Sequence, residues 1–174
     1  MRRNIRTSTI SSHEELADAI QGLFVAELLM PSEPLWIISP WISDITVIDN
    51  RTGRFKGLLP DMPRREIHLS EVLISQLQRG GSLVIASRPV DHNRLFIDHL
   101  IGRAYEVECG NRIRCHQAED LHEKGILARG LYLEGSMNIT YNGIRRLEEA
   151  INLSDSDDTI TRTRQAFEDR WGRN

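Results

Sequence analysis

His122 and Lys124 stand two residues apart in the stretch LHEKGILARGLYLEGSMNIT, residues 121–140, and Ser136 and Asn138 stand two apart near its end. Side chains at this spacing point to the same side of an extended chain. Lysine, serine and asparagine supply hydrogen-bond donors for the oxygens of a phosphodiester, and a neutral histidine can attack phosphorus or transfer a proton. The stretch is therefore either an ordinary amphipathic hairpin or half of a phosphate-handling site.

Glu148 and Glu149 follow these residues on the next expected strand. One of the two carboxylates could accept a hydrogen bond from the His122 imidazole and fix its tautomer, as an orienting carboxylate does in other histidine-based sites. The His-x-Lys pattern by itself is weak evidence for a site. Together with Gly-Ser-x-Asn and a downstream Glu, it indicates one.

The segments around this motif alternate between helix and strand patterns. The apolar runs 35–39 and 82–87 have the length and continuity of strands buried on both faces. A capping-box pattern opens a predicted helix over 12–30, and Gly80-Gly81 ends another over 70–79. Further helices are predicted over 92–104 and after 154–158, a short turn or helix near 141–146, and strands over 111–117, 122–128, 131–134 and 148–153.

This order of elements predicts one α/β domain over residues 1–174, with a mixed β-sheet flanked by helices on both faces. Residues 1–11 are interpreted as a basic N-terminal arm. The polar segment 43–67 contains Gly and Pro and is long enough to be a functional loop.

Four basic residues are candidates for contacts with a nucleic-acid substrate. The expected loop carries cations that could follow a DNA backbone, each contact adding to a salt-dependent affinity. A solvated surface loop is the alternative interpretation. The four candidates are Arg51, Arg54, Lys56 and Arg129.

The composition limits the classes of protein. A net charge of −3 argues against a grossly basic coat protein for nucleic acid, although it allows a local basic cleft. No apolar run approaches the length of a membrane span, and the basic start lacks the apolar core of a signal peptide. Cys109 and Cys115 do not make a disulfide framework. We therefore expect a cytoplasmic protein with reduced thiols and no membrane partner.

A metal site is an alternative interpretation of the region before the motif. Cys115, His116, Glu119, Asp120 and His122 lie close together in the sequence. Their spacing is not a recognised zinc pattern, and the acidic residues can equally form a turn. We expect no metal and no cofactor.

The combined motif resembles the signature of the phospholipase D superfamily. That signature is His-x-Lys followed by Gly-Ser-x-Asn, with a Glu some eleven residues after the Asn, and Glu149 matches it. The segments LWIISPWIS, SLVIAS after Gly-Gly, and Phe167-x-x-x-Trp171 are also similar, so the resemblance covers roughly residues 12–172. Arg129 stands where the fuller pattern has an Asp.

Several details resemble the nuclease branch of that superfamily. Restriction-type members often lack the same Asp, and GSMNITYNG resembles their Gly-Ser-x-Asn-x-Thr-x-Asn-Gly run. The size and general look also resemble DpdK-type proteins of DNA-modification or restriction systems. These similarities imply a nuclease acting on DNA, including modified DNA, with partner proteins in a restriction or defence setting.

The resemblance also implies a mechanism. His122 attacks phosphorus and forms a phosphohistidine, Lys124, Ser136 and Asn138 hold the phosphoryl oxygens, and Glu149 orients His122. The superfamily works with two facing motifs, whereas this chain has one, which implies a homodimer with a shared, metal-independent site. The alternative is a catalytically degenerate, nucleic-acid-binding subunit of a larger complex.

Overall fold

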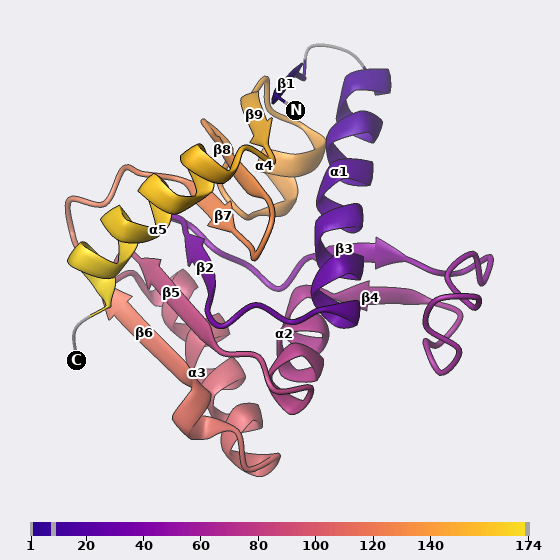
Figure 1. Ribbon diagram of the computed structural model, residues 1–174, viewed down its shortest axis with the longest axis horizontal. Helices are drawn as coiled ribbons and strands as arrows, with labels where there is room; N and C mark the ends of the chain where they lie inside the picture. Colours follow the sequence, from indigo (N-terminus) through magenta and orange to yellow (C-terminus); the bar gives the residue numbers. More distant parts are fainter. Residues whose placement is uncertain (1, 8–9, 173–174) are drawn as a thin grey trace.

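One mixed sheet forms the centre of the computed structural model, which describes residues 2–7 and 10–172. The sheet has seven strands in the order β1-β9-β8-β7-β2-β5-β6 (Figure 1). β2, β5 and β6 are parallel to one another, and antiparallel pairing joins β7 to β2, β8 to β7, β9 to β8 and β1 to β9. The strands are β1 (Arg2–Arg6), β2 (Leu35–Ile38), β5 (Leu83–Ser87), β6 (Ile113–Gln117), β7 (Gly125–Leu127), β8 (Tyr132–Gly135) and β9 (Ala150–Ser154).

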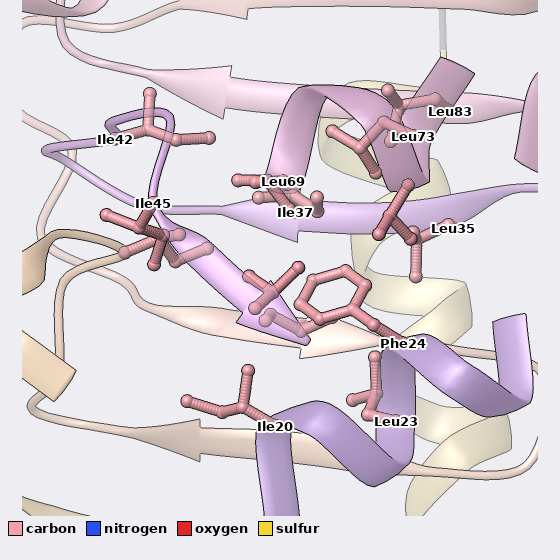
Figure 2. Packing of buried hydrophobic residues seen from close by; sticks show 14 of the residues in the cluster. Ile20, Leu23, Phe24, Leu35, Ile37, Ile42, Ile45, Leu69, Leu73 and Leu83 are labelled. Carbon is pink, nitrogen blue, oxygen red and sulfur yellow. The ribbon is translucent and has the colours of Figure 1, made fainter. Parts of the chain in front are cut away.

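Helices cover both faces of this sheet. On one face, α1 (Ile10–Leu29), α2 (Leu69–Gln78) and α3 (Asp91–Glu106) contribute to the larger hydrophobic cluster. Figure 2 shows Phe24 of α1 near Leu35 of β2, and Leu73 of α2 belongs to the same cluster. On the other face, α5 (Asp157–Trp171) packs Phe167 against Trp36 of β2, with ring centroids 5.8 Å apart. The predicted α/β architecture is therefore confirmed.

The two central strands are buried because both faces are covered. Every residue of β2 and of β5 is buried, as expected for strands without polar alternation. Their side chains alternate between the clusters, since Leu35 and Ile37 belong to the larger one and Trp36 and Ile38 to the smaller. No helix in the described part of the chain is long and apolar enough to cross a membrane.

Two segments form strands that the sequence did not reveal. Part of the expected N-terminal arm is β1, an edge strand that pairs with β9 and buries Ile5. Within the expected loop 43–67, β3 (Thr46–Asp49) and β4 (Glu66–His68) form a separate two-stranded sheet. These three strands are short. β1 pairs with a strand far along the chain, and the pairing of β3 with β4 is irregular, so local sequence is a weak signal for them.

The predicted strands around the motif are shorter than expected. β7 begins at Gly125 rather than at residue 122, and β9 begins at Ala150 rather than at residue 148. The short helix α4 (Tyr141–Arg145) follows β8 within the predicted 141–146 region. The chemical side chains of the motif therefore lie in the connections beside the strands.

A buried carboxylate ties the turn between β7 and β8 to the rest of the chain. Glu27 of α1 is 2% exposed and accepts hydrogen bonds from the Ser32 backbone N–H (2.9 Å) and the Ser32 hydroxyl (2.6 Å). The Ser32 hydroxyl also accepts one from the backbone N–H of Arg129, at 2.6 Å. Burial raises the pKa of Glu27 from its ordinary value of 4.5, although the Ser32 bonds oppose this.

The raised pKa of Glu27 predicts a pH dependence of stability. The folded state holds the Glu27 proton more tightly than the unfolded state, so this contribution is complete below pH 4.5 and is lost as the pH rises through the folded pKa. We expect the wild type to lose stability relative to Glu27→Gln as the pH rises above 4.5. Urea denaturation of both proteins at a series of pH values measures this difference, and a flat difference would contradict the prediction.

Candidate active site

The five residues of the predicted site lie at one edge of the sheet. Strand pairing places the end of β2 beside the start of β7, through Ile38 and Gly125. The same pairing places the end of β8 beside the start of β9, through Gly135 and Ile151. The predicted side chains precede or follow these strand ends: His122 and Lys124 come before β7, Ser136 and Asn138 after β8, and Glu149 before β9.

His122 and Lys124 occupy the extended segment that leads into β7. The His122 side chain is exposed and that of Lys124 is half-buried. The Lys124 ammonium donates a hydrogen bond to the backbone carbonyl of His122, at 2.8 Å. The Lys124 carbonyl accepts one from the backbone N–H of Gly135, at 3.5 Å, which places Lys124 opposite the residue before Ser136. The backbone of Lys124 is therefore adjacent to the segment that carries Ser136.

Ser136 and Glu149 are in direct contact. The Ser136 hydroxyl donates a hydrogen bond to the Glu149 carboxylate and accepts one from the backbone N–H of Ala150, at 3.0 Å. Glu149 is held in turn by Thr7, whose buried hydroxyl accepts a hydrogen bond from the Glu149 backbone N–H at 2.7 Å. The hydrogen bond expected between Glu149 and His122 is not present in the described chain. Glu149 contacts Ser136 in this structure, and its orienting role stays a prediction.

Asn138 lies in a segment that is fixed to the end of β2. The buried Ser39 hydroxyl accepts a hydrogen bond from the Ile139 backbone N–H at 3.1 Å, and the Ile139 carbonyl accepts one from the Ser43 N–H at 2.9 Å. The side-chain carbonyl of Asn138 is buried without a partner in the described chain. This atom is an acceptor and needs a donor, so it cannot itself bind a phosphoryl oxygen, and the role of the Asn138 N–H groups stays a prediction.

Arg88 also contacts His122, although no sequence motif marks it. It follows β5 directly and is half-buried. Its guanidinium Nη2 lies 3.1 Å from Nδ1 and 3.3 Å from Nε2 of His122, and its Nε donates to the Leu121 carbonyl at 2.9 Å. The usable signal was its position, because ligands in α/β proteins bind beyond the carboxyl ends of parallel strands.

Three of the predicted substrate contacts lie in the connection between β3 and β4. Arg51 pairs with Asp49 at 2.6 Å and lowers the pKa of that carboxyl to about 2, and Arg54 lies 3.5 Å from Asp18. Lys56 is exposed. In Figure 1 this connection extends to the right, whereas the arrowheads of β2, β5 and β6 point to the upper left. No contact joins these three cations to His122 in the described chain.

A groove connects this basic region to the residues after Asn138. It runs between α1, β3 and α4, and Arg51, Arg54 and Arg145 are among its lining residues. The acidic side chains of Glu14, Asp18 and Asp49 also line it. None of the five predicted site residues lines this groove.

Arg129 lies at the opposite end of β7 from His122. Its backbone N–H bonds to Ser32, and its guanidinium donates to the Pro31 carbonyl at 3.2 Å. Arg129 is therefore placed away from His122, and its contact with a substrate stays a prediction. Its contacts show a structural part in closing the turn between β7 and β8.

The alternative metal site does not assemble. No group of three His, Cys, Asp or Glu side chains in residues 2–7 and 10–172 is placed to hold a metal ion. His116 packs against the ring of Trp171, with centroids 5.8 Å apart, and burial lowers its pKa. Burial raises the pKa of the Cys115 thiol to about 12, and both cysteines are free.

Comparison with solved structures defines the class of fold to which this arrangement belongs. The chain has the mixed α/β fold of phospholipase D-like proteins. No protein-family model and no curated protein sequence matches it.

Three of the similar structures show the extent of this likeness. NucT from Helicobacter pylori aligns with a TM-score of 0.59 and 12% identity, over 97% of this chain and 94% of that one. Nuc from Salmonella typhimurium, a phospholipase D family member, aligns with a TM-score of 0.60 and 11% identity, over 99% and 94% of the two chains. TrmBL2, an archaeal chromatin protein with a novel mode of DNA binding, aligns with a TM-score of 0.56 and 10% identity, over 98% and 52%.

Gly135 has a backbone position that other residues cannot occupy without strain. Its φ is +156°, and a Cβ there would lie 2.1 Å from the carbonyl oxygen of Ala150, which accepts a hydrogen bond from Ser136. We expect Gly135→Ala to lower the free energy of unfolding by about 1–3 kcal/mol, because β8 must move away from β9. Urea denaturation measures the loss.

Gly102→Ala is the matched control for this substitution. Gly102 lies in α3, and an added Cβ would meet nothing within 4 Å. Alanine is the better helix former, so this variant should gain up to about 1 kcal/mol. Equal stability of the Gly135→Ala variant and the wild type would show that β8 and β9 are not closely packed at this point.

Proposed function

We propose that this chain is a metal-independent phosphodiesterase that cleaves DNA. The observation that carries the proposal is the contact of Ser136 with Glu149 on connections that adjoin the one carrying His122 and Lys124, beside neighbouring strand ends. Those residues come from three separate segments, and they match the motif positions of a superfamily whose fold this chain has. Nuc, which shares the fold, is a phospholipase D family member, and this supports a phosphodiesterase reaction.

The proposed reaction has two displacement steps at phosphorus. An unprotonated ring nitrogen of His122 forms an N–P bond while the P–O bond to the leaving group breaks, and the leaving oxygen takes a proton from His122 of the partner subunit. Water then attacks the phosphohistidine and gives its proton to that same imidazole, while the N–P bond breaks. Both histidines end in their starting states.

Charge on the phosphoryl group is stabilised by fixed donors. The Lys124 ammonium and the N–H groups of the Asn138 amide supply donors for the non-bridging oxygens, and the ammonium contacts a backbone carbonyl rather than a carboxylate. Ser136 is oriented by the Glu149 carboxylate, which accepts its hydroxyl proton in a hydrogen bond. Donors held in place before the reaction need little reorganisation during it.

A homodimer completes the proposed site. The sequence holds one His-x-Lys pair, and the mechanism needs two imidazoles at one phosphorus. A two-fold axis beside the exposed His122 brings two copies of this edge together through the same surface on each subunit.

DNA is the proposed substrate, with a restriction or defence system as the setting. The similarity of GSMNITYNG to restriction-type members supports this choice. The groove lined by Arg51, Arg54 and Arg145 begins beside α4, which follows Asn138 closely, so a strand leaving the site could follow it. Modified DNA and partner proteins belong to the same proposal.

A DNA-binding subunit without catalysis is the second candidate function. TrmBL2 shares the fold and is described as a chromatin protein with a novel mode of DNA binding, which favours this alternative. It requires the fold and a basic surface, but no reaction at His122. Cleavage assays separate the two functions.

The first test combines a chelator with removal of the nucleophile. Labelled single- and double-stranded DNA is incubated with the wild type and with His122→Ala in excess EDTA. We expect the wild type to cleave in EDTA and His122→Ala to lose activity by about a thousandfold or more. His122 is exposed, so the variant should fold normally.

His99→Ala is the matched control, because His99 is an exposed histidine of α3. It should cleave as the wild type does. Cleavage that disappears with EDTA, or that survives His122→Ala, rules out the proposed mechanism. Tight DNA binding without cleavage of either substrate supports the binding subunit instead.

The second test concerns the shared site. Light scattering after size exclusion should give the mass of a dimer. Heterodimers of wild type and His122→Ala, purified by a different tag on each subunit, should then have almost no activity, because each reaction needs both imidazoles. Half of the wild-type activity, or a strictly monomeric active protein, would mean that one chain works alone.

A further inference from the structure

Arg88 is a cation at the candidate site that does not belong to the sequence motif. It lies directly after β5, a strand that is not part of the His-x-Lys hairpin. Its Nε donates to the Leu121 carbonyl at 2.9 Å, and its Nη2 lies 3.1 and 3.3 Å from the two ring nitrogens of His122. A guanidinium has only donors, so this contact requires a ring nitrogen with a free lone pair.

The backbone of Arg88 is held rigidly. Asn93, which is fully buried, donates hydrogen bonds to the Arg88 carbonyl at 2.9 Å and to the Pro40 carbonyl at 2.7 Å. Its side-chain oxygen accepts one from the Ile42 backbone N–H at 3.0 Å. Asn93 therefore fixes the start of the Arg88 side chain against the connection that follows β2.

The charge of Arg88 is not neutralised within the described chain. Elsewhere on the surface, arginines such as Arg51, Arg65 and Arg162 form ion pairs with carboxylates. Arg88 instead contacts a carbonyl and an imidazole, and Lys124 likewise contacts only a carbonyl. Two cations without carboxylate partners thus flank His122, which is the charge pattern expected where an anion binds.

Building on the proposed phosphodiester chemistry, we propose that Arg88 is a phosphate-binding residue of this site. Without substrate, its guanidinium Nη2 contacts the imidazole of His122. When a phosphate group occupies the site, its non-bridging oxygens are stronger acceptors than the imidazole, and the guanidinium turns to them. The bond from Nε to Leu121 keeps the guanidinium beside His122 during this exchange, and the ring nitrogen is released for attack.

Direct binding of inorganic phosphate tests this assignment without requiring turnover. Phosphate is titrated into the wild type, Arg88→Gln and Arg88→Lys, and the His122 ring signals are followed by NMR. We expect Arg88→Gln to weaken phosphate binding by about tenfold or more, and Arg88→Lys to weaken it less, because it keeps the charge but not the fork of donors. The His122 signals of the free protein should also change in Arg88→Gln.

Arg79→Gln is the control. Arg79 is exposed, precedes β5 at the opposite end from Arg88, and donates only to the Ser75 hydroxyl, at 3.3 Å. It removes the same charge and should leave phosphate binding unchanged. Thermal unfolding first establishes that both variants are folded. The proposal is overturned if Arg88→Gln then binds phosphate as tightly as the wild type.

Salt dependence gives a second measure with the intended substrate. The affinity for DNA is measured at several salt concentrations in a His122→Asn background, which prevents cleavage, with and without Arg88→Gln. The magnitude of the slope of log affinity against log salt should fall by about 0.7–0.9 for each phosphate contact that Arg88→Gln removes. An unchanged slope counts against the proposal. If no variant or wild type cleaves DNA, the proposed function fails, whereas phosphate binding that depends on Arg88 still supports its assignment. Normal cleavage with Arg88-independent phosphate binding rejects only the role of Arg88.

Discussion

The antiparallel pairing of β7 with β2 is the contact on which the rest of the structure depends. It joins a parallel half, β2, β5 and β6, to an antiparallel half made of β7, β8, β9 and β1. Because the two strands run in opposite directions, the start of β7 lies where β2 and β5 end. Without this pairing, His122 and Lys124 would have no fixed relation to Arg88, which comes from the other half of the sheet.

The edge is held in place mainly by hydrogen bonds of small buried polar groups. Thr7 fixes Glu149, Ser39 fixes the segment after Asn138, and Asn93 fixes Arg88. Each is almost fully buried and bonds to backbone groups at strand ends that have no partner in the sheet. The His122 side chain can remain exposed because other residues position the backbone of the neighbouring strand ends.

The parts that sequence could predict are those with a local signal. The unbroken runs LWII and LVIAS marked the buried strands, and Gly80-Gly81 marked the end of α2. β1 was missed because RRNIR has one buried apolar residue and becomes a strand only through β9. Spacing singles out the five motif residues, and their role stays a prediction. Arg88 could not be singled out in this way, because its contact with His122 spans 34 residues and depends on strand order.

The exposed position of His122 has a consequence for how proteins with this fold evolve. The His122 side chain is exposed and belongs to no hydrophobic cluster, so replacing it should alter stability little. A protein with this fold and a catalytic histidine at this position can therefore lose its activity through one substitution while it keeps its fold. The fold then persists after the activity is lost, so the residues beside the strand ends distinguish active from inactive relatives better than the sheet does.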